Sequence, residues 1–161
     1  MLGEVFGLEP DVNGALAVAS DSNDLVVMTR TYNVPTAKIA GTFGQAIIGV
    51  PEDDMIESLQ VRRITFGTQD SEFRTNLGCV NGKDEDVRIY IDLFDETGDL
   101  LETKTMDLGP WSNKQINKIF NPYAPTNGYA DVYVDQAGAS FYCYGSVLDN
   151  STSDPTTVVP Q

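Results

Sequence analysis

The sequence predicts an all-β fold: an antiparallel β-sandwich, Ig-like or jelly-roll-like, with about nine or ten strands and almost no helix. Two observations lead to this class. Residues 87–93 place an apolar side chain at every second position, and this period of two is typical of a half-buried strand. Short segments of similar character recur along the chain between clusters of turn residues, as in sandwiches and barrels.

The first third of the chain contains four expected strands and one helical turn. Residues 14–20 and 25–32 are predicted to pair as a hairpin across the turn residues 21–24. Further strands are expected at 42–50 and 59–66. Between them, Pro51 followed by acidic residues favours one short helical turn within 51–58.

The centre of the chain, residues 73–106, is predicted to form three consecutive strands joined by two tight turns. The second turn, 95–99, contains Gly98 where a hairpin loop needs a positive φ angle. A short strand or an irregular edge segment is expected within 112–120. Residues 128–135 and 139–148 are predicted to form a further hairpin. The polar tail, 149–161, is interpreted as a loop followed by an extended segment.

The composition excludes several classes of function. The 161 residues fit one domain, and the net charge of −14 with a pI near 4.1 argues against a nucleic-acid or anionic-membrane partner. No segment approaches the ~20 apolar residues of a membrane helix, so we expect no membrane insertion. The N-terminal residues lack the profile of a signal peptide. If the protein is extracellular, we therefore expect it to be cut from a longer precursor.

Histidine is absent from the chain, which removes the Ser-His-Asp and Cys-His types of catalysis and His-ligated zinc. The many acidic residues are sequence neighbours in predicted loops. A glycosidase instead needs two carboxyl groups facing each other across a cleft. We therefore expect a protein that is not an enzyme and has no cofactor.

The two cysteines, Cys79 and Cys143, lie in predicted strands with apolar neighbours. Two cysteines are too few for a structural zinc site, and they lack C-x-x-C spacing. The sequence leaves two alternatives open, which are buried free thiols or a disulfide that ties two strands together.

The two ends of the chain resemble each other at a distance of 114 residues. This shift places Phe6 on Phe120, Gly14 on Gly128 and Val18 on Val132, and after a short offset Asn33 falls on Asn150. We interpret residues 1–50 and 115–161 as equivalent repeat segments within one sandwich module of 161 residues. They would flank a single-copy meander, residues 51–114, whose apolar face is expected to pack against Leu16/Val18 and Val132/Val134 alike.

Several motifs resemble a known family. The segments FRTNLGCVN (73–81), GPWSNKQINKIF (109–120) and YGSVLDNSTSDPT (144–156) are similar to uncharacterised β-sandwich repeats of large secreted or surface proteins of bacteria. The segments MTRTYN (28–33) and GTFGQAIIGVP (41–51) look like the matching part of the preceding repeat. The resemblance implies an extracellular, Ig-like sandwich and supplies no catalytic or ligand-binding residues.

Two weak candidate sites remain. Calcium takes oxygen ligands in flexible loops, so Asp95 with Asp99, and Asp21 with Asp24, are candidate ligands, although neither loop has the D-x-D-x-D-G order. Tyr142, Tyr144 and Trp111 are candidates for stacking on sugar rings.

We expect a non-catalytic structural or adhesion module that is secreted or on the cell surface, such as a stalk, spacer or fibre subunit. Its partners would be neighbouring copies or modules of the same protein, as a homo-oligomer or by strand addition. The alternative is a carbohydrate-binding module attached to a secreted hydrolase.

Overall fold

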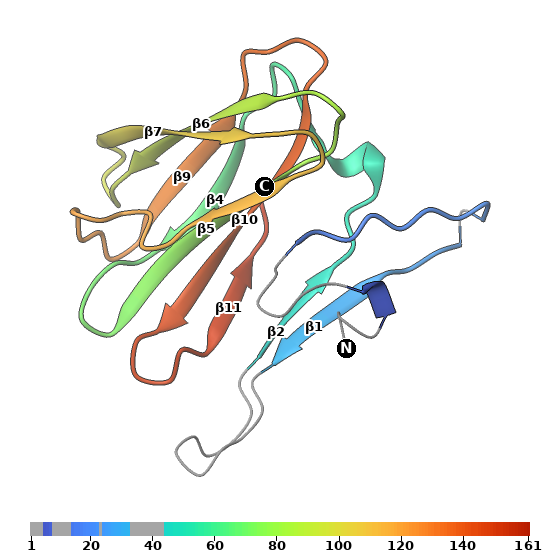
Figure 1. The fold of residues 1–161 in the computed structure, drawn as a ribbon. Helices are drawn as coiled ribbons and strands as arrows, with labels where there is room; N and C mark the ends of the chain where they lie inside the picture. The colour runs from blue at the N-terminus through green and yellow to red at the C-terminus, as the bar shows by residue number, and fades with distance from the viewer. Residues whose placement is uncertain (1–4, 8–13, 23, 33–43) are drawn as a thin grey trace.

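The computed structural model describes residues 5–7, 14–22, 24–32 and 44–161, which form eleven β-strands in antiparallel sheets that pack together (Figure 1). Helical conformation in these residues is limited to 5–6 and one 3-10 turn, η1 (Glu52–Asp54), and the latter confirms the predicted turn after Pro51. The strands are β1 (Met28–Tyr32), β2 (Gly44–Ile48), β3 (Ile56–Glu57), β4 (Arg62–Gly67), β5 (Phe73–Asn81), β6 (Val87–Phe94), β7 (Leu100–Leu108), β8 (Asn113–Ile116), β9 (Gly128–Tyr133), β10 (Ser140–Asp149) and β11 (Pro155–Val158).

Two sheets form the sandwich. One has the strand order β11-β10-β5-β8, with the short β3 pairing with β10, and the other has the order β4-β9-β6-β7. The β1–β2 hairpin is a separate two-stranded sheet beside β11 (Figure 1). The predicted all-β sandwich class is therefore confirmed. Strand β11 lies in the tail that was expected to be extended, although no strand was assigned there, because its sequence, PTTV, follows a polar loop and shows no alternation.

The core lies between the two sheets. The alternating side chains of β6 are buried, with Ile89, Ile91 and Leu93 fully enclosed, as the sequence predicts. They belong to one cluster with Val132 and Val134, since β9 is the direct neighbour of β6. This part of the packing prediction is confirmed.

The corresponding N-terminal residues do not reach that core. Leu16 and Val18 are each 55% exposed, and residues 14–20 form no strand. The predicted hairpin between 14–20 and 25–32 is also wrong, because β1 pairs with β2. Alternation indicates which side chains are suited to burial, but a strand also needs a neighbour for its backbone hydrogen bonds.

The predicted meander of residues 51–114 needs correction as well. The β6–β7 hairpin exists, but β5 lies in the opposite sheet, between β10 and β8. The chain thus crosses between the sheets after Asn81. Strand β5 is buried over most of its length, as suits a central strand covered on both faces. The predicted hairpin of β9 and β10 is also wrong, because the two strands belong to different sheets.

Two asparagine side chains of β5 form hydrogen bonds with the backbone of the loops where the chain passes between the sheets. Asn81 donates to the carbonyl oxygens of Glu85 (2.6 Å) and Gly109 (2.9 Å), and its Oδ1 accepts the Lys83 backbone N–H (3.0 Å). In β5, Asn76 Oδ1 likewise accepts the Lys118 N–H at 3.0 Å. These amides satisfy loop backbone groups near the core.

Candidate functional site

Cys79 and Cys143 form a disulfide between directly opposite positions of β5 and β10. Both side chains are buried, at 1% and 0% exposure. Of the two alternatives that the sequence left open, free thiols or a disulfide, the structure shows the disulfide. Such a bond is consistent with an oxidising, extracellular environment.

Two candidate sugar-stacking residues, Tyr142 and Tyr144, lie on the outer face of β10, two positions apart; we call this surface the tyrosine face. A Cβ at Gly78, opposite Tyr144, would lie 2.6 Å from the Tyr144 ring carbon Cζ. The ring therefore covers the Gly78 backbone. Its hydroxyl donates to Gln115 Oε1 on β8 at 3.4 Å. Burial raises the pKa of both tyrosines, with a smaller contribution from Asp54 at Tyr142.

The third candidate, Trp111, occupies the turn between β7 and β8 with a positive φ of 51°. Its side chain is 60% exposed, and its backbone N–H donates to the Lys83 carbonyl at 3.0 Å. Two residues after Trp111, Asn113 on β8 lies opposite Val80 on β5. On its other side, Val80 lies opposite Tyr142 on β10. Trp111 is therefore near one end of the tyrosine face.

Of the candidate calcium ligands, Asp95 caps a turn through its side chain. Asp95 Oδ1 accepts hydrogen bonds from Thr97 Oγ1 (2.8 Å), the Thr97 N–H (2.9 Å) and the Asp99 N–H (2.9 Å). These donors, the Thr97 hydroxyl first, lower the pKa of Asp95. Asp21 and Asp24 are both exposed. Within the ranges that the structure describes, no group of three or more His, Cys, Asp or Glu residues could hold a metal ion. Calcium binding stays a prediction.

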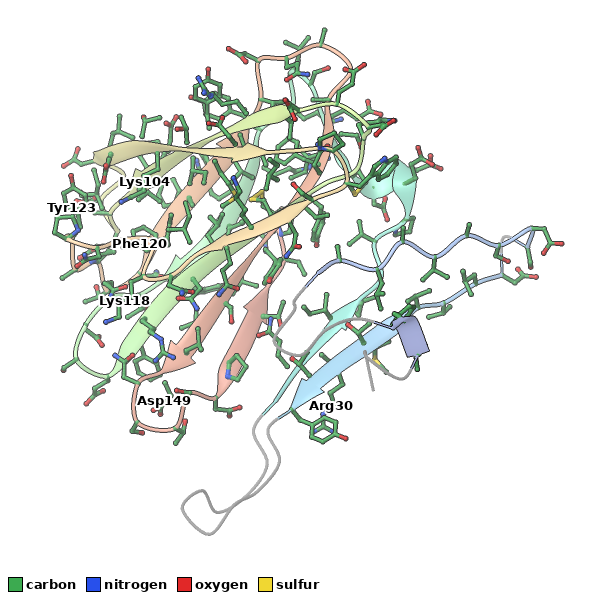
Figure 2. All side chains as sticks on the ribbon, in the orientation of Figure 1. Arg30, Lys104, Lys118, Phe120, Tyr123 and Asp149 are labelled. Carbon is green, nitrogen blue, oxygen red and sulfur yellow. A yellow bond between two sulfur atoms is a disulfide. The ribbon has the colours of Figure 1, made fainter. Side chains whose placement is uncertain are left out.

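A similar cap closes the loop between β10 and β11. Asp149 Oδ1 accepts from Ser151 Oγ (2.5 Å), the Ser151 N–H (2.7 Å) and the Thr152 N–H (3.0 Å). The Ser151 hydroxyl is the largest cause of a lowered pKa at Asp149. Figure 2 shows Asp149 at the end of β10. The side-chain amide of the next residue, Asn150, donates to the carbonyl oxygens of Asp70 and Ser71, which precede β5.

We expect Ser151→Ala to raise the pKa of Asp149 toward 3.8, the ordinary value, because the substitution removes its strongest donor. A carboxylate with a lowered pKa in the folded state stabilises the protein above the unfolded pKa, and this contribution is lost as the pH falls through the folded pKa. The variant should therefore lose less stability on acidification than the wild type. Carboxyl ¹³C titration by NMR measures the shift, with Asp95 as the internal control; an unchanged Asp149 pKa contradicts the assignment.

A group that the sequence analysis missed lies on the outer face of the second sheet, and we call it the ring face. Tyr90 stacks on Tyr133 with centroids 5.4 Å apart, and Phe94 stacks on Tyr129 at 4.7 Å. Each pair is directly cross-strand between β6 and β9. The alternation of residues 128–135 contained the signal, because the inward Ala130 and Val132 leave the aromatic residues on the outside.

The ring face is held together by its own contacts. The guanidinium carbon of Arg63 lies 4.0 Å from the Tyr129 ring centroid, and Arg63 binds Asp131 with both Nε and Nη2 at 2.8 Å. Each of these rings thus turns one face toward its stacking partner, and Tyr129 also lies against Arg63. The stacking is a cross-strand stabilising contact.

An open groove of about 630 Å³ lies at the end of this sheet, beside β6, β7 and β8. Two of its cationic side chains already have partners: Arg88 Nε binds Asp107 Oδ1 at 2.6 Å, and Lys114 donates to the Asp107 carbonyl. Arg88 lowers the pKa of Asp107. A ligand would compete with these pairs for its contacts.

The β1–β2 hairpin exposes an apolar surface. Val26 is 87% exposed, and Met28 and Ile48 are each 70% exposed. The hairpin contacts the sandwich through Ser146 Oγ to Gln45 Oε1 (3.1 Å) and Thr157 Oγ1 to the Ala46 carbonyl (3.3 Å). Large exposed apolar groups on a two-stranded sheet are unusual for a surface that stays in water.

Comparisons with family models, curated proteins and solved structures gave no match. The fold class is thus shown by the structure, and the family resemblance rests on the quoted motifs. Among the described residues, no helix has the length and apolar character needed to cross a membrane.

Proposed function

We propose that this protein is a non-catalytic structural module of an extracellular or cell-surface protein, which joins neighbouring modules through its N-terminal hairpin. The observation that carries the proposal is the apolar surface at Val26, Met28 and Ile48 beside a closed, disulfide-tied sandwich. A surface of this kind is typical of an interface.

The polar groups of the sandwich support the same proposal. Asp95 and Asp149 cap turns, while Arg63 and Arg88 are each paired with a carboxylate. Side chains committed in this way stiffen loops and sheet faces, as suits a stalk or spacer. Adhesion would then involve loops and strand edges.

The structural role predicts resistance to proteolysis. Digestion of the oxidised protein should first remove residues before 51 and leave 51–161 as a persistent fragment, because cleavage requires local opening and the sandwich opens rarely. Mass spectrometry under nonreducing conditions identifies the fragment. The protein with its disulfide reduced is the matched control and should be cut faster within 51–161. Rapid cleavage of the oxidised sandwich would overturn the stalk proposal.

The second candidate is a carbohydrate-binding module, favoured by the tyrosine face, where the Tyr144 ring covers Gly78 next to the amide of Gln115. Sugars bind to aromatic faces flanked by such amides. This function predicts retardation in polysaccharide-containing gels and its loss in Tyr144→Ala, with Tyr129→Ala on the ring face as control. If the protein is instead a purely structural module, it should migrate through the same gels without retardation.

A further inference from the structure

The β1–β2 hairpin repeats the pairing of the β10–β11 hairpin. Met28 lies opposite Ile48, and Gly145 lies opposite Val158. Both ladders continue without a shift in register toward the end of the first strand. In the sequence an asparagine follows each first strand directly, Asn33 after β1 and Asn150 after β10, 117 positions apart. The first strands, β1 and β10, therefore correspond at a spacing of 117, and through the two ladders β2 corresponds to β11 at a spacing of 110.

Corresponding side chains differ sharply in exposure. Val26 corresponds to Cys143, which is 0% exposed, yet Val26 is 87% exposed. Ile48, 70% exposed, corresponds to Val158, which packs against the core of the sandwich. The exposed face of the hairpin is thus the face that points inward in β10–β11.

The residues before each hairpin show the same contrast. At the 114-residue spacing, Leu16 and Val18 correspond to Ala130 and Val132 of β9. The pair in β9 is 2% and 0% exposed, whereas Leu16 and Val18 are each 55% exposed. A whole set of core-type side chains at the N-terminal end therefore lacks a core.

We propose that residues 14–22, 24–32 and 44–48 close a second sandwich, and that their partner is an open unit of the same kind. By an open unit we mean one with strands equivalent to β4–β8 and without closing strands of its own. This inference rests on the proposed function and names the partner of its interface. Strand β1 would pair with a β5-like strand in the register of β10 with β5, so that Val26 lies opposite the position of Cys79.

A second copy of this chain does not fit as the partner. Its β5 is already paired along its whole length with β10 and on its other side with β8. The Cys79–Cys143 bond further prevents β10 from leaving. An open unit has that edge and that core face free, and the apolar side chains of the hairpin would complete it.

Register-specific cross-linking tests the proposal. Full-length Val26→Cys protein is mixed with a synthetic peptide of residues 73–81 in a glutathione redox buffer, and the mixed disulfide is measured by mass spectrometry. The matched control is Met28→Cys, which is also exposed but would lie opposite Leu77. Because a disulfide needs Cβ atoms within about 4.5 Å, we expect the adduct of Val26→Cys to form about tenfold faster.

Moving the peptide cysteine should reverse the preference. A peptide with Leu77→Cys and Cys79→Ser should react faster with Met28→Cys than with Val26→Cys. Equal rates for both proteins with both peptides would overturn the proposal. So would faster formation of a disulfide-linked homodimer of the Val26→Cys protein, which makes a second copy the occupant. Either result leaves the proteolysis test unaffected, so failure of this inference and failure of the structural function are distinguishable.

Discussion

Removing the Cys79–Cys143 disulfide is expected to lower the free energy of unfolding by about 4 kcal/mol, the chain-entropy value for a loop of this length. The bridge joins cysteines 64 residues apart in sequence, so the unfolded reduced chain gains the freedom of a long loop. Both side chains are enclosed in the core, and β5 and β10 form the longest ladder of their sheet. The loss should therefore affect the central pairing of that sheet.

Urea unfolding of the oxidised and the reduced protein measures this difference. The Cys79→Ala/Cys143→Ala variant is the control, since its unfolding midpoint should not respond to reductant. Coincident midpoints for the oxidised and reduced wild type would show that the cross-link does not restrict the unfolded chain.

Phe120→Ala is expected to destabilise the protein by about 3–5 kcal/mol, the usual cost of removing a buried aromatic ring. Phe120, labelled in Figure 2, follows β8 in the sequence. It is 1% exposed, and the preceding residue, Ile119, is fully buried. Its ring lies against Gly67, where an added Cβ would overlap it. Since Gly67 leaves no side chain to fill the space, the cavity should persist in the variant.

The matched control is Phe66→Ala, one residue before Gly67. Phe66 is 62% exposed, so the same truncation there removes little packing and should change the stability far less. Thermal unfolding should show a fall of about 10 °C or more for Phe120→Ala. Similar shifts for the two variants would mean that Phe120 does not anchor the core.

The sequence predicted the side-chain directions of the strands better than their neighbours. Alternation assigned the inward face of β6 because only one face of that strand is buried. It did not place β5 in the other sheet, since side-chain period carries no information on which strand provides the hydrogen bonds. The disulfide stayed open for the same reason, because it depends on Cys79 and Cys143 being opposite each other.

For the candidate sites too, the sequence predicted side-chain direction but not the contacts with neighbouring strands. Tyr142 and Tyr144 were assigned to one face by their spacing of two, whereas the ring of Tyr144 over Gly78 depends on a neighbouring strand. Asp95 belongs to a loop that the sequence located, but its backbone donors exist only in the folded turn. The exposure of Val26 and Met28 could not be predicted, because the apolar run of residues 25–28 is equally typical of a buried strand.

The position of the disulfide has a mechanical consequence. Cys79 and Cys143 are neighbours within one sheet, so the bond reinforces that layer and does not connect the two layers. Tension along the strands would be resisted within the cross-linked layer by a covalent bond. Between the layers it would meet non-covalent contacts, such as Ile64 packed against Gly145 and the Lys114 side chain bonded to the Asp107 carbonyl. Under such tension we therefore expect the two layers to slide over each other before the cross-linked layer itself is pulled apart.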